Sequence, residues 1–231
     1  VFQFEGSVCT KCKEKLMKMT VTPPGDIRPA FEGDRQLIKK VISQTFGEEL
    51  ASAMFPDNKI ILINKIGALD VKYELFIDGF NIGVICYEIP ECIYKFKMKP
   101  YGGHYILYYS KKLNIPLRKY ISITDDAEEF ILNHASVLVP SVHEYSSDIE
   151  PGDYILLVNS TKDKILGSGI ARVSSADIPE VMREGRGIIA KNKYHMKKYK
   201  DIRDPFEPAR DITLHDAFVH NHDFIESQID E

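Results

Sequence analysis

The chain has 231 residues, of which 44% are hydrophobic and 28% are charged, and its formal net charge is −4. This length is enough for two modest domains with hydrophobic cores. No stretch approaches the roughly 18 uninterrupted apolar residues of a membrane span, and four cysteines are too few for a disulfide framework. These features argue against a membrane protein or a disulfide-rich secreted one, so we expect a cytoplasmic protein.

One pair of cysteines near the start, Cys9-Thr-Lys-Cys12, has the spacing of metal or redox ligands. A structural zinc site needs four ligands, and no second Cys-x-x-Cys pair precedes Pro23. We therefore expect Cys9 and Cys12 to hold zinc substoichiometrically or not at all, and the sequence indicates no other cofactor.

Residues 31–55 have the pattern of an amphipathic helix. Asp34 stands where an N-cap is expected, and Pro56 ends the pattern. Gly47 is expected to kink or divide the helix. Its apolar residues recur at steps of three and four: Leu37, Ile38, Val41, Ile42 and Phe46.

A strand over residues 59–64 and a β-hairpin over Tyr73–Tyr87 are predicted next. Asp78-Gly79 is a strong signal for a two-residue hairpin turn. A helix followed by antiparallel strands predicts an α+β unit.

Positive charge is concentrated in two runs of the sequence. No acidic residue lies between Glu91 and Asp125, and lysines alternate with bulky residues in Tyr94–Lys99, so a strand there would place all three ammonium groups on one face. Such runs suit RNA phosphates and bases, although a merely solvated face is the alternative. The first run contains Lys95, Lys97, Lys99, Lys111, Lys112, Arg118 and Lys119, and the second contains Lys191, Lys193, Lys197, Lys198 and Lys200.

Residues 120–196 read as several short strands with two short helices. Asp125 is expected to cap the first helix, with Glu128 completing a capping box. Gly167 and Gly169 within a strand indicate a bulge or a close approach of another backbone. Short strands separated by turn residues predict a small closed or half-closed barrel.

The order of these signals resembles the PUA domain, a small RNA-binding pseudo-barrel. The resemblance implies an RNA-directed role, with tRNA as the leading candidate because PUA relatives often serve tRNA or rRNA modification. The segments that carry it are Tyr120–Thr124, Asp125–Asn133, Ala135–Pro140, Pro151–Val158, Ile165–Arg172 and Gly185–Lys191.

The residues before this domain are similar to the region that precedes the PUA domain in archaeal phosphoadenosine-phosphosulfate-reductase-like proteins. The similarity is carried by Thr22–Asp34, Ile61–Lys65 and the Val71–Val84 hairpin. In that family the order is a zinc-ribbon-like start, a pre-PUA domain, a PUA domain and a nucleotide-binding sulfotransfer-type domain. The Ser-Gly-Gly-Lys-Asp-type phosphate loop of the last domain is absent from this chain, so reductase activity is not carried over to these residues.

The fold class expected is therefore α+β, with a pre-PUA domain followed by a PUA β pseudo-barrel. The expected divisions are a degenerate zinc-ribbon-like start at residues 1–22, the pre-PUA domain at 23–118, the PUA domain at 119–196 and a charged tail or linker at 197–231.

The expected function is RNA binding in the service of RNA modification. The first alternative is the substrate-binding part of a reductase-like or sulfur-transfer enzyme whose catalytic domain lies elsewhere, and the second is a protein-interaction adaptor. No catalytic set stands out, which leaves the question of enzyme activity open. The groove of PUA relatives implies Ser136, Ser141, Lys191 and Lys193 as RNA-binding residues, with the capping of a turn as the alternative role for Ser141. Arg172 joins them if its side chain points outward, and the basic runs add Lys95, Lys97, Lys99, Arg118 and Lys119.

Overall fold

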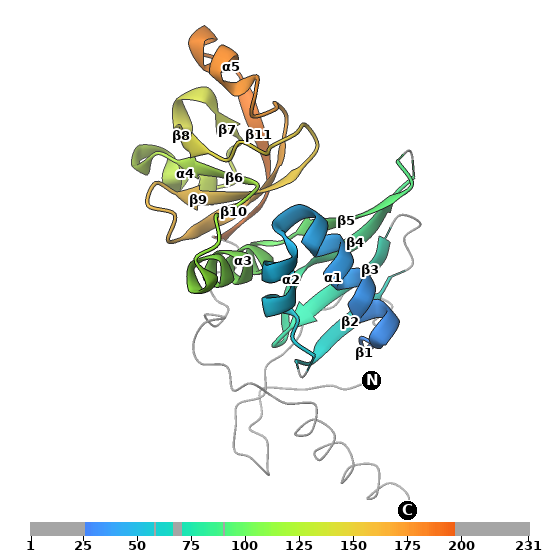
Figure 1. Cartoon of the computed structure of the whole chain (residues 1–231). Coiled ribbons are helices and arrows are strands. Elements are labelled where there is room, and N and C mark those ends of the chain that lie inside the picture. Colours follow the sequence, from blue (N-terminus) through green and yellow to red (C-terminus); the bar gives the residue numbers. More distant parts are fainter. Residues whose placement is uncertain (1–25, 58, 67–70, 90, 197–231) are drawn as a thin grey trace, which may run out of the picture.

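The structure is a computed structural model that describes residues 26–57, 59–66, 71–89 and 91–196. It contains two sheets in chain order, with helices packed on the first (Figure 1). This is the mixed α+β fold expected from the sequence. The zinc-ribbon-like start and the charged tail that we predicted lie outside the described residues. No helix in the described part of the chain is both long enough and apolar enough to cross a membrane.

The first sheet has five antiparallel strands in the order β1-β2-β3-β4-β5. Helices α1 and α2 cover one of its faces (Figure 1). The strands are β1 (Asp26–Pro29), β2 (Ile61–Lys65), β3 (Val71–Ile77), β4 (Phe80–Glu88) and β5 (Ile93–Met98), and the helices are α1 (Glu32–Phe46) and α2 (Glu48–Met54). Strand β1 was not predicted from the sequence.

The helical segment divides at Gly47, as the sequence indicated. Gly47 has a φ of +95°, which other residues rarely adopt, and it separates α1 from α2. The prediction of Asp34 as the N-cap was wrong, because Phe31 occupies that position. Asp34 lies one turn further on, where its carboxylate accepts hydrogen bonds from the Phe31 amide at 3.1 Å and the Arg28 guanidinium at 2.7 Å.

The hairpin between β3 and β4 confirms the turn prediction. Asp78 and Gly79 both have positive φ, 51° and 80°, as a two-residue type I′ turn requires. Asp78 also accepts a hydrogen bond from the Tyr105 hydroxyl at 2.6 Å and pairs with Lys59 at 3.0 Å, which ties the turn to the body of the unit.

The second sheet has six strands in the order β7-β11-β10-β9-β6-β8 and is barrel-shaped (Figure 1). The pair β6–β9 is parallel, and the other pairs are antiparallel. Its strands are β6 (Tyr120–Ile123), β7 (Val137–Leu138), β8 (Val142–Tyr145), β9 (Tyr154–Asn159), β10 (Ile165–Ala171) and β11 (Ile188–His195). Its helices are η1 (Asp125–Ala127), α4 (Glu128–Leu132), η2 (Val139–Ser141) and α5 (Ile178–Glu184).

Two local predictions in this sheet had different outcomes. Close backbone approach at the glycines of β10 is confirmed, since a Cβ on Gly167 would lie 2.5 Å from the Tyr194 carbonyl oxygen and one on Gly169 would lie 2.8 Å from that of Lys191. The capping box at Asp125 was wrong, because no side chain caps this helix. The Asp125 carboxylate instead accepts a hydrogen bond from the Ser160 hydroxyl at 2.5 Å.

Helix α3 (Pro100–Leu113), which we did not predict, joins the two sheets. A Cβ on Gly102 would lie 2.1 Å from the Ile82 carbonyl oxygen of the first sheet, and a Cβ on Gly103 would lie 2.7 Å from Leu156 Cδ2 of the second. Four residues of the second sheet belong to the same apolar core as the first unit: Tyr120, Leu156, Val158 and Ile165. The two units therefore share buried packing at α3.

Candidate nucleic-acid interface

Two adjoining hollows lie on the second sheet between α4, β7 and β11. The first, which we call the cationic hollow, has a volume of about 440 Å³ and is lined by Ser136, Arg172, Ile188 and Lys191. The second, the apolar hollow, has a volume of about 330 Å³ and is lined by Asp126, Ala127, Phe130, Ile131, Ala135, Ser136, Leu138, Pro140 and Ser141. Ser136 lines both, so the hollows are neighbours. The structure thus brings together Ser136, Arg172 and Lys191, three of the residues predicted from the sequence.

Strand pairing places the two cations of the cationic hollow. Lys191 lies opposite Ile170 of β10 and is exposed, while its neighbours Ala190 and Asn192 are buried. Arg172 follows directly after β10, and its amide donates to the Ile189 carbonyl oxygen at 2.8 Å. This backbone bond holds the exposed Arg172 beside β11.

The cationic hollow has no carboxylate among its lining residues. Within the described residues, no ion pair involves Arg172, Lys191 or Lys193. Lys193 is exposed further along β11 but lines neither hollow. Cations without a partner carboxylate are available to bind an anion, and RNA phosphates are anions.

Large apolar side chains are exposed around both hollows. Phe130 is 66% exposed, Leu138 47% and Ile188 51%. Sequence reasoning missed Phe130 as a residue of the site. Ile131 is only 1% exposed. Phe130 and Ile131 are consecutive residues of helix α4, which has five residues. Consecutive residues of a helix point in different directions, and this signal could have indicated that the two side chains do not share one environment.

Ser141, another predicted site residue, is buried and bonded within its own turn. Its hydroxyl donates to the Leu138 carbonyl oxygen at 2.6 Å and accepts from the Leu138 amide at 3.0 Å. This pair of bonds fixes the turn that carries Leu138 and Pro140 at the apolar hollow, so the side chain shapes the site.

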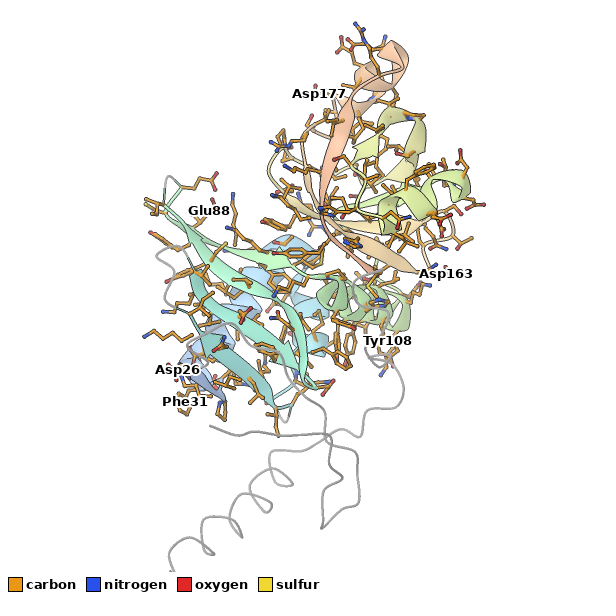
Figure 2. The ribbon with its side chains drawn as sticks, turned by 180° about the vertical axis from the view of Figure 1, so that it is seen from behind. Asp26, Phe31, Glu88, Tyr108, Asp163 and Asp177 are labelled. Atoms are coloured by element: carbon orange, nitrogen blue, oxygen red, sulfur yellow. The ribbon has the colours of Figure 1, made fainter. Side chains whose placement is uncertain are left out.

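The lysine strip on β5 has the predicted alternation but is paired with acids. Phe96 and Met98 are buried, whereas Lys95 and Lys97 lie on the opposite face. Lys95 pairs with Glu91 at 2.6 Å, Lys97 with Glu88 at 3.5 Å, and Lys99 with the buried Glu74 at 3.3 Å. Glu88 is labelled at the end of β4 in Figure 2. The strip therefore carries less free positive charge than its sequence indicates.

Arg118 and Lys119, also predicted to bind RNA, hold the loop between β8 and β9. Arg118 pairs with Asp148 at 3.0 Å, and Lys119 pairs with Asp153 at 2.6 Å with its side chain only 13% exposed. Burial opposes the ionisation of Asp148, but hydrogen bonds from the Ser146 hydroxyl, the Lys119 amide and the Arg118 guanidinium outweigh it and lower the pKa of Asp148. Both cations thus have structural partners.

The structure does not test the metal prediction. Cys9 and Cys12 lie outside the described residues, as do the basic residues from Lys197 onward. Within the described part of the chain, no group of three or more His, Cys, Asp or Glu side chains is arranged to hold a metal ion. Cys86 is buried and Cys92 is exposed, and the two are not joined in a disulfide.

Comparison with known proteins identifies the second unit. The family model described as "PUA domain" matches residues 119–195. An uncharacterized protein, MJ0066, of Methanocaldococcus jannaschii is 32% identical over 215 residues, which are 90% of this chain and 42% of the relative. The chain thus spans less than half the length of that relative.

Two solved structures share the fold. A hypothetical protein of Pyrococcus horikoshii matches with a TM-score of 0.57 at 19% identity, over 77% of this chain and 99% of its own. A conserved PUA domain protein from Thermoplasma acidophilum matches with a TM-score of 0.50 at 17% identity, over 73% of this chain and 93% of its own. In both, the match extends over most of the other chain.

Proposed function

We propose that the PUA domain formed by residues 119–195 binds RNA through the cationic hollow and serves tRNA or rRNA modification. PUA domains are known for RNA binding. The observation that carries the proposal is that Arg172 and Lys191 line the same hollow and that its lining contains no carboxylate. In the first unit, by contrast, every lysine of the predicted strip has an acidic partner.

The chemistry of this hollow suits a phosphate backbone. Arg and Lys neutralise phosphates and release counterions, which supplies most sequence-independent affinity. Structured RNA is recognised mainly through its shape, its phosphates and its 2′-hydroxyl groups. The half-buried Ser136 beside the two cations offers a hydroxyl to the same ligand. Among structured RNAs, we propose tRNA as the ligand.

We propose that the protein acts in the cytoplasm. Cys86 and Cys92, the two cysteines within the described residues, are not joined in a disulfide, which suits a reducing compartment. Lys193 extends the exposed cations along β11, and we propose that it contacts the RNA backbone next to the hollow.

The test is a charge-reversal pair at the hollow. Arg172→Glu combined with Lys191→Glu should weaken tRNA binding by about a hundredfold or more, since two bonds to charged groups are lost and each contributes about 1.5–3 kcal/mol. The slope of log affinity against log salt should fall by about 1.4–1.8, which is two phosphate contacts. Both side chains are exposed, so thermal unfolding should be unchanged.

The matched control reverses two exposed lysines of the first unit, Lys40 and Lys65, and changes the net charge by the same amount. This control should bind tRNA nearly as the parent does. If the hollow variant and the control have the same affinity and the same salt slope, the RNA-binding site does not lie at the cationic hollow.

A second candidate is that this chain corresponds to the substrate-binding part of a phosphoadenosine-phosphosulfate-reductase-like or sulfur-transfer enzyme. The observation in its favour is the length of the M. jannaschii relative, of which the chain covers 42%. We propose that the two units described here present RNA to a catalytic domain. Sulfite release from phosphoadenosine phosphosulfate, or sulfur incorporation into tRNA, should then require the full-length relative. If the full-length relative catalyses neither reaction, this candidate is wrong.

A further inference from the structure

We propose that the exposed face of helix α3 is a docking surface for residues 201–231 of this chain, which we call the acidic segment. The α3 face is formed by Tyr108, Tyr109, Lys111 and Lys112, near the end of the helix that both sheets share. It has no residue in common with the cationic hollow, and the inference does not depend on RNA binding.

The first argument is the chemistry of the α3 face. Tyr108, labelled in Figure 2, is 43% exposed, and its ring meets that of Tyr109 edge-on with the two centroids 5.1 Å apart. The Lys112 ammonium group lies 5.7 Å and 5.9 Å from the centroids of these rings. A surface that combines a cation with aromatic rings suits a partner that carries both carboxylates and apolar side chains.

The second argument is the positive charge of α3. The helix contains no Asp or Glu, and within the described residues no ion pair involves Lys111 or Lys112. The Asp163 carboxylate lies near Lys111, but it accepts a hydrogen bond from the Asn159 side chain at 2.6 Å. Lysines in the last turn also suit the helix dipole. The dipole does not account for the exposed tyrosine beside them.

The third argument is the position of the end of β11. In Figure 1, β11 runs from α5 down to α3. Met196, which follows β11, packs against the same apolar core as Tyr105 and Leu107 of α3. Only four residues separate Met196 from the acidic segment, which is therefore tethered beside this helix. Short tethers give effective concentrations of about the millimolar range, so a weak contact is enough for docking.

The fourth argument is the composition of the acidic segment. It contains nine carboxylate side chains and two arginines, so it complements the charge of the α3 face. Docking there also keeps these carboxylates away from the cationic hollow, which leaves Arg172 and Lys191 open to an anion. Bulky apolar side chains lie among the acids and are available to pack on the tyrosine rings: Ile212, Leu214, Phe218, Phe224, Ile225 and Ile229.

The experiment is zero-length cross-linking of the full chain with a carbodiimide, followed by peptide mass spectrometry. The reagent joins an amine to a carboxylate only where the two groups are in contact. We expect cross-links from Lys111 or Lys112 to the acidic segment. The exposed pair Lys39 and Asp57, with 2.8 Å between its charged atoms, is the internal positive control. The exposed Lys40 of α1 should form no cross-link to the acidic segment.

A mixture of isotopically labelled and unlabelled protein shows whether a cross-link joins one molecule or two. The cross-links of the α3 face should join peptides that carry the same label, because the docked segment belongs to the same chain. This control separates docking within the chain from contact between two copies.

Two variants assign the contact to the α3 face. Trypsin cleaves a docked segment only while it is released, so the cleavage rate after Arg210 reports docking. Lys111→Glu combined with Lys112→Glu should raise that rate by about fivefold or more, because two surface attractions become repulsions. Tyr108→Ala should raise it by roughly twofold to tenfold, because one aromatic contact is lost.

The matched control for the charge reversal is Lys40→Glu combined with Lys65→Glu, since both lysines are exposed on the first unit. The control for the aromatic substitution is Phe31→Ala, because Phe31 is 65% exposed. Both controls should be cleaved after Arg210 at the rate of the parent. Equal cleavage rates in the α3 variants and in these controls would contradict the proposal.

The cross-links also show which other surface binds the acidic segment if α3 does not. Cross-links to Lys191 or Lys193 instead would overturn the proposal and place the segment at the cationic hollow. Cross-links that form only between labelled and unlabelled molecules would overturn it too, and would make the α3 face an interface between copies. The proposal is also wrong if Lys39 is cross-linked but Lys111 and Lys112 are not. If tRNA then protects those two lysines from acetylation, the α3 face binds RNA.

Discussion

Replacing Gly102 with alanine should destabilise the protein although alanine is the better helix former. Gly102 lies inside α3, where the change from glycine gains about 1 kcal/mol of helix propensity. The added Cβ would lie 2.1 Å from the Ile82 carbonyl oxygen and 3.3 Å from Met98 Cγ. Real Cβ atoms essentially never approach within 3.0 Å, so α3 must move away from β4 by about 1 Å.

That movement is costly because α3 is packed on both sides. On its other side, Gly103 already faces Leu156 of the second sheet. Overpacking a well-packed core costs about 1–3 kcal/mol and occasionally more, and a backbone oxygen within a paired strand yields less than a side chain does. The contact with a paired backbone oxygen therefore belongs in the upper part of that range, at about 2–3 kcal/mol. After subtraction of the propensity gain of about 1 kcal/mol, we expect a net loss of about 1–2 kcal/mol in the free energy of unfolding.

The assay is urea-induced unfolding followed by circular dichroism, with Gly33→Ala as the control. Gly33 is also helical, in α1, but nothing lies within 4 Å of where its Cβ would be. The control should be more stable than the parent, by about 0.4–1 kcal/mol. A Gly102→Ala variant that is as stable as the Gly33→Ala variant would refute the packing argument for α3.

Further predictions concern the ion pairs, the loop and the metal. Lys99→Met should destabilise the protein by about 3 kcal/mol or more, because it leaves the buried Glu74 carboxylate without its ammonium partner; adding Glu74→Gln should restore most of the loss in urea unfolding. Lys119→Ala should lower the melting temperature yet leave the salt slope of tRNA binding unchanged, since its ammonium group is bound within the fold. The folded-state pKa of Asp148 lies below its ordinary value of 3.8, so its stabilising contribution is present above that pH and is lost as the pH falls through the folded pKa; the difference in melting temperature between the parent and Asp148→Asn should therefore be largest near neutral pH and shrink below pH 4. Elemental analysis should find less than one zinc per chain, and one tightly held zinc that is lost in Cys12→Ser would contradict this.

Local sequence signals predicted the structure correctly where the backbone conformation depends on neighbouring residues alone. Asp78-Gly79 predicted the hairpin turn because few residue pairs accept two positive φ values in succession. Gly47 predicted the division of the first helical segment, because glycine readily adopts the positive φ that separates α1 from α2. The alternation in Tyr94–Lys99 placed lysines and bulky residues on opposite faces of β5, because side chains alternate along any strand.

Sequence patterns also located half of the candidate site. The order of strands and turns in residues 120–196 indicated the barrel-shaped sheet, and its resemblance to PUA domains pointed to Ser136, Arg172 and Lys191, which the structure places in one hollow. The apolar hollow was not predicted. Its existence depends on Phe130 pointing outward while Ile131 points into the core, a choice that the short helix alone does not specify.

Two features were decided only by the tertiary structure, namely the packing of α3 and the ion pairs of the lysines, because both depend on residues that are distant in the chain. Helix α3 contains two adjacent glycines, which local propensity disfavours, yet they allow both sheets to pack against one helix. The lysines of β5 looked like a free cationic strip, but β3 and the β4–β5 hairpin bring Glu74, Glu88 and Glu91 to them. Turn and strand preferences act over a few residues and can be read from sequence. Burial and charge pairing depend on which segments the fold brings together, and they decide which cations remain free to bind a ligand.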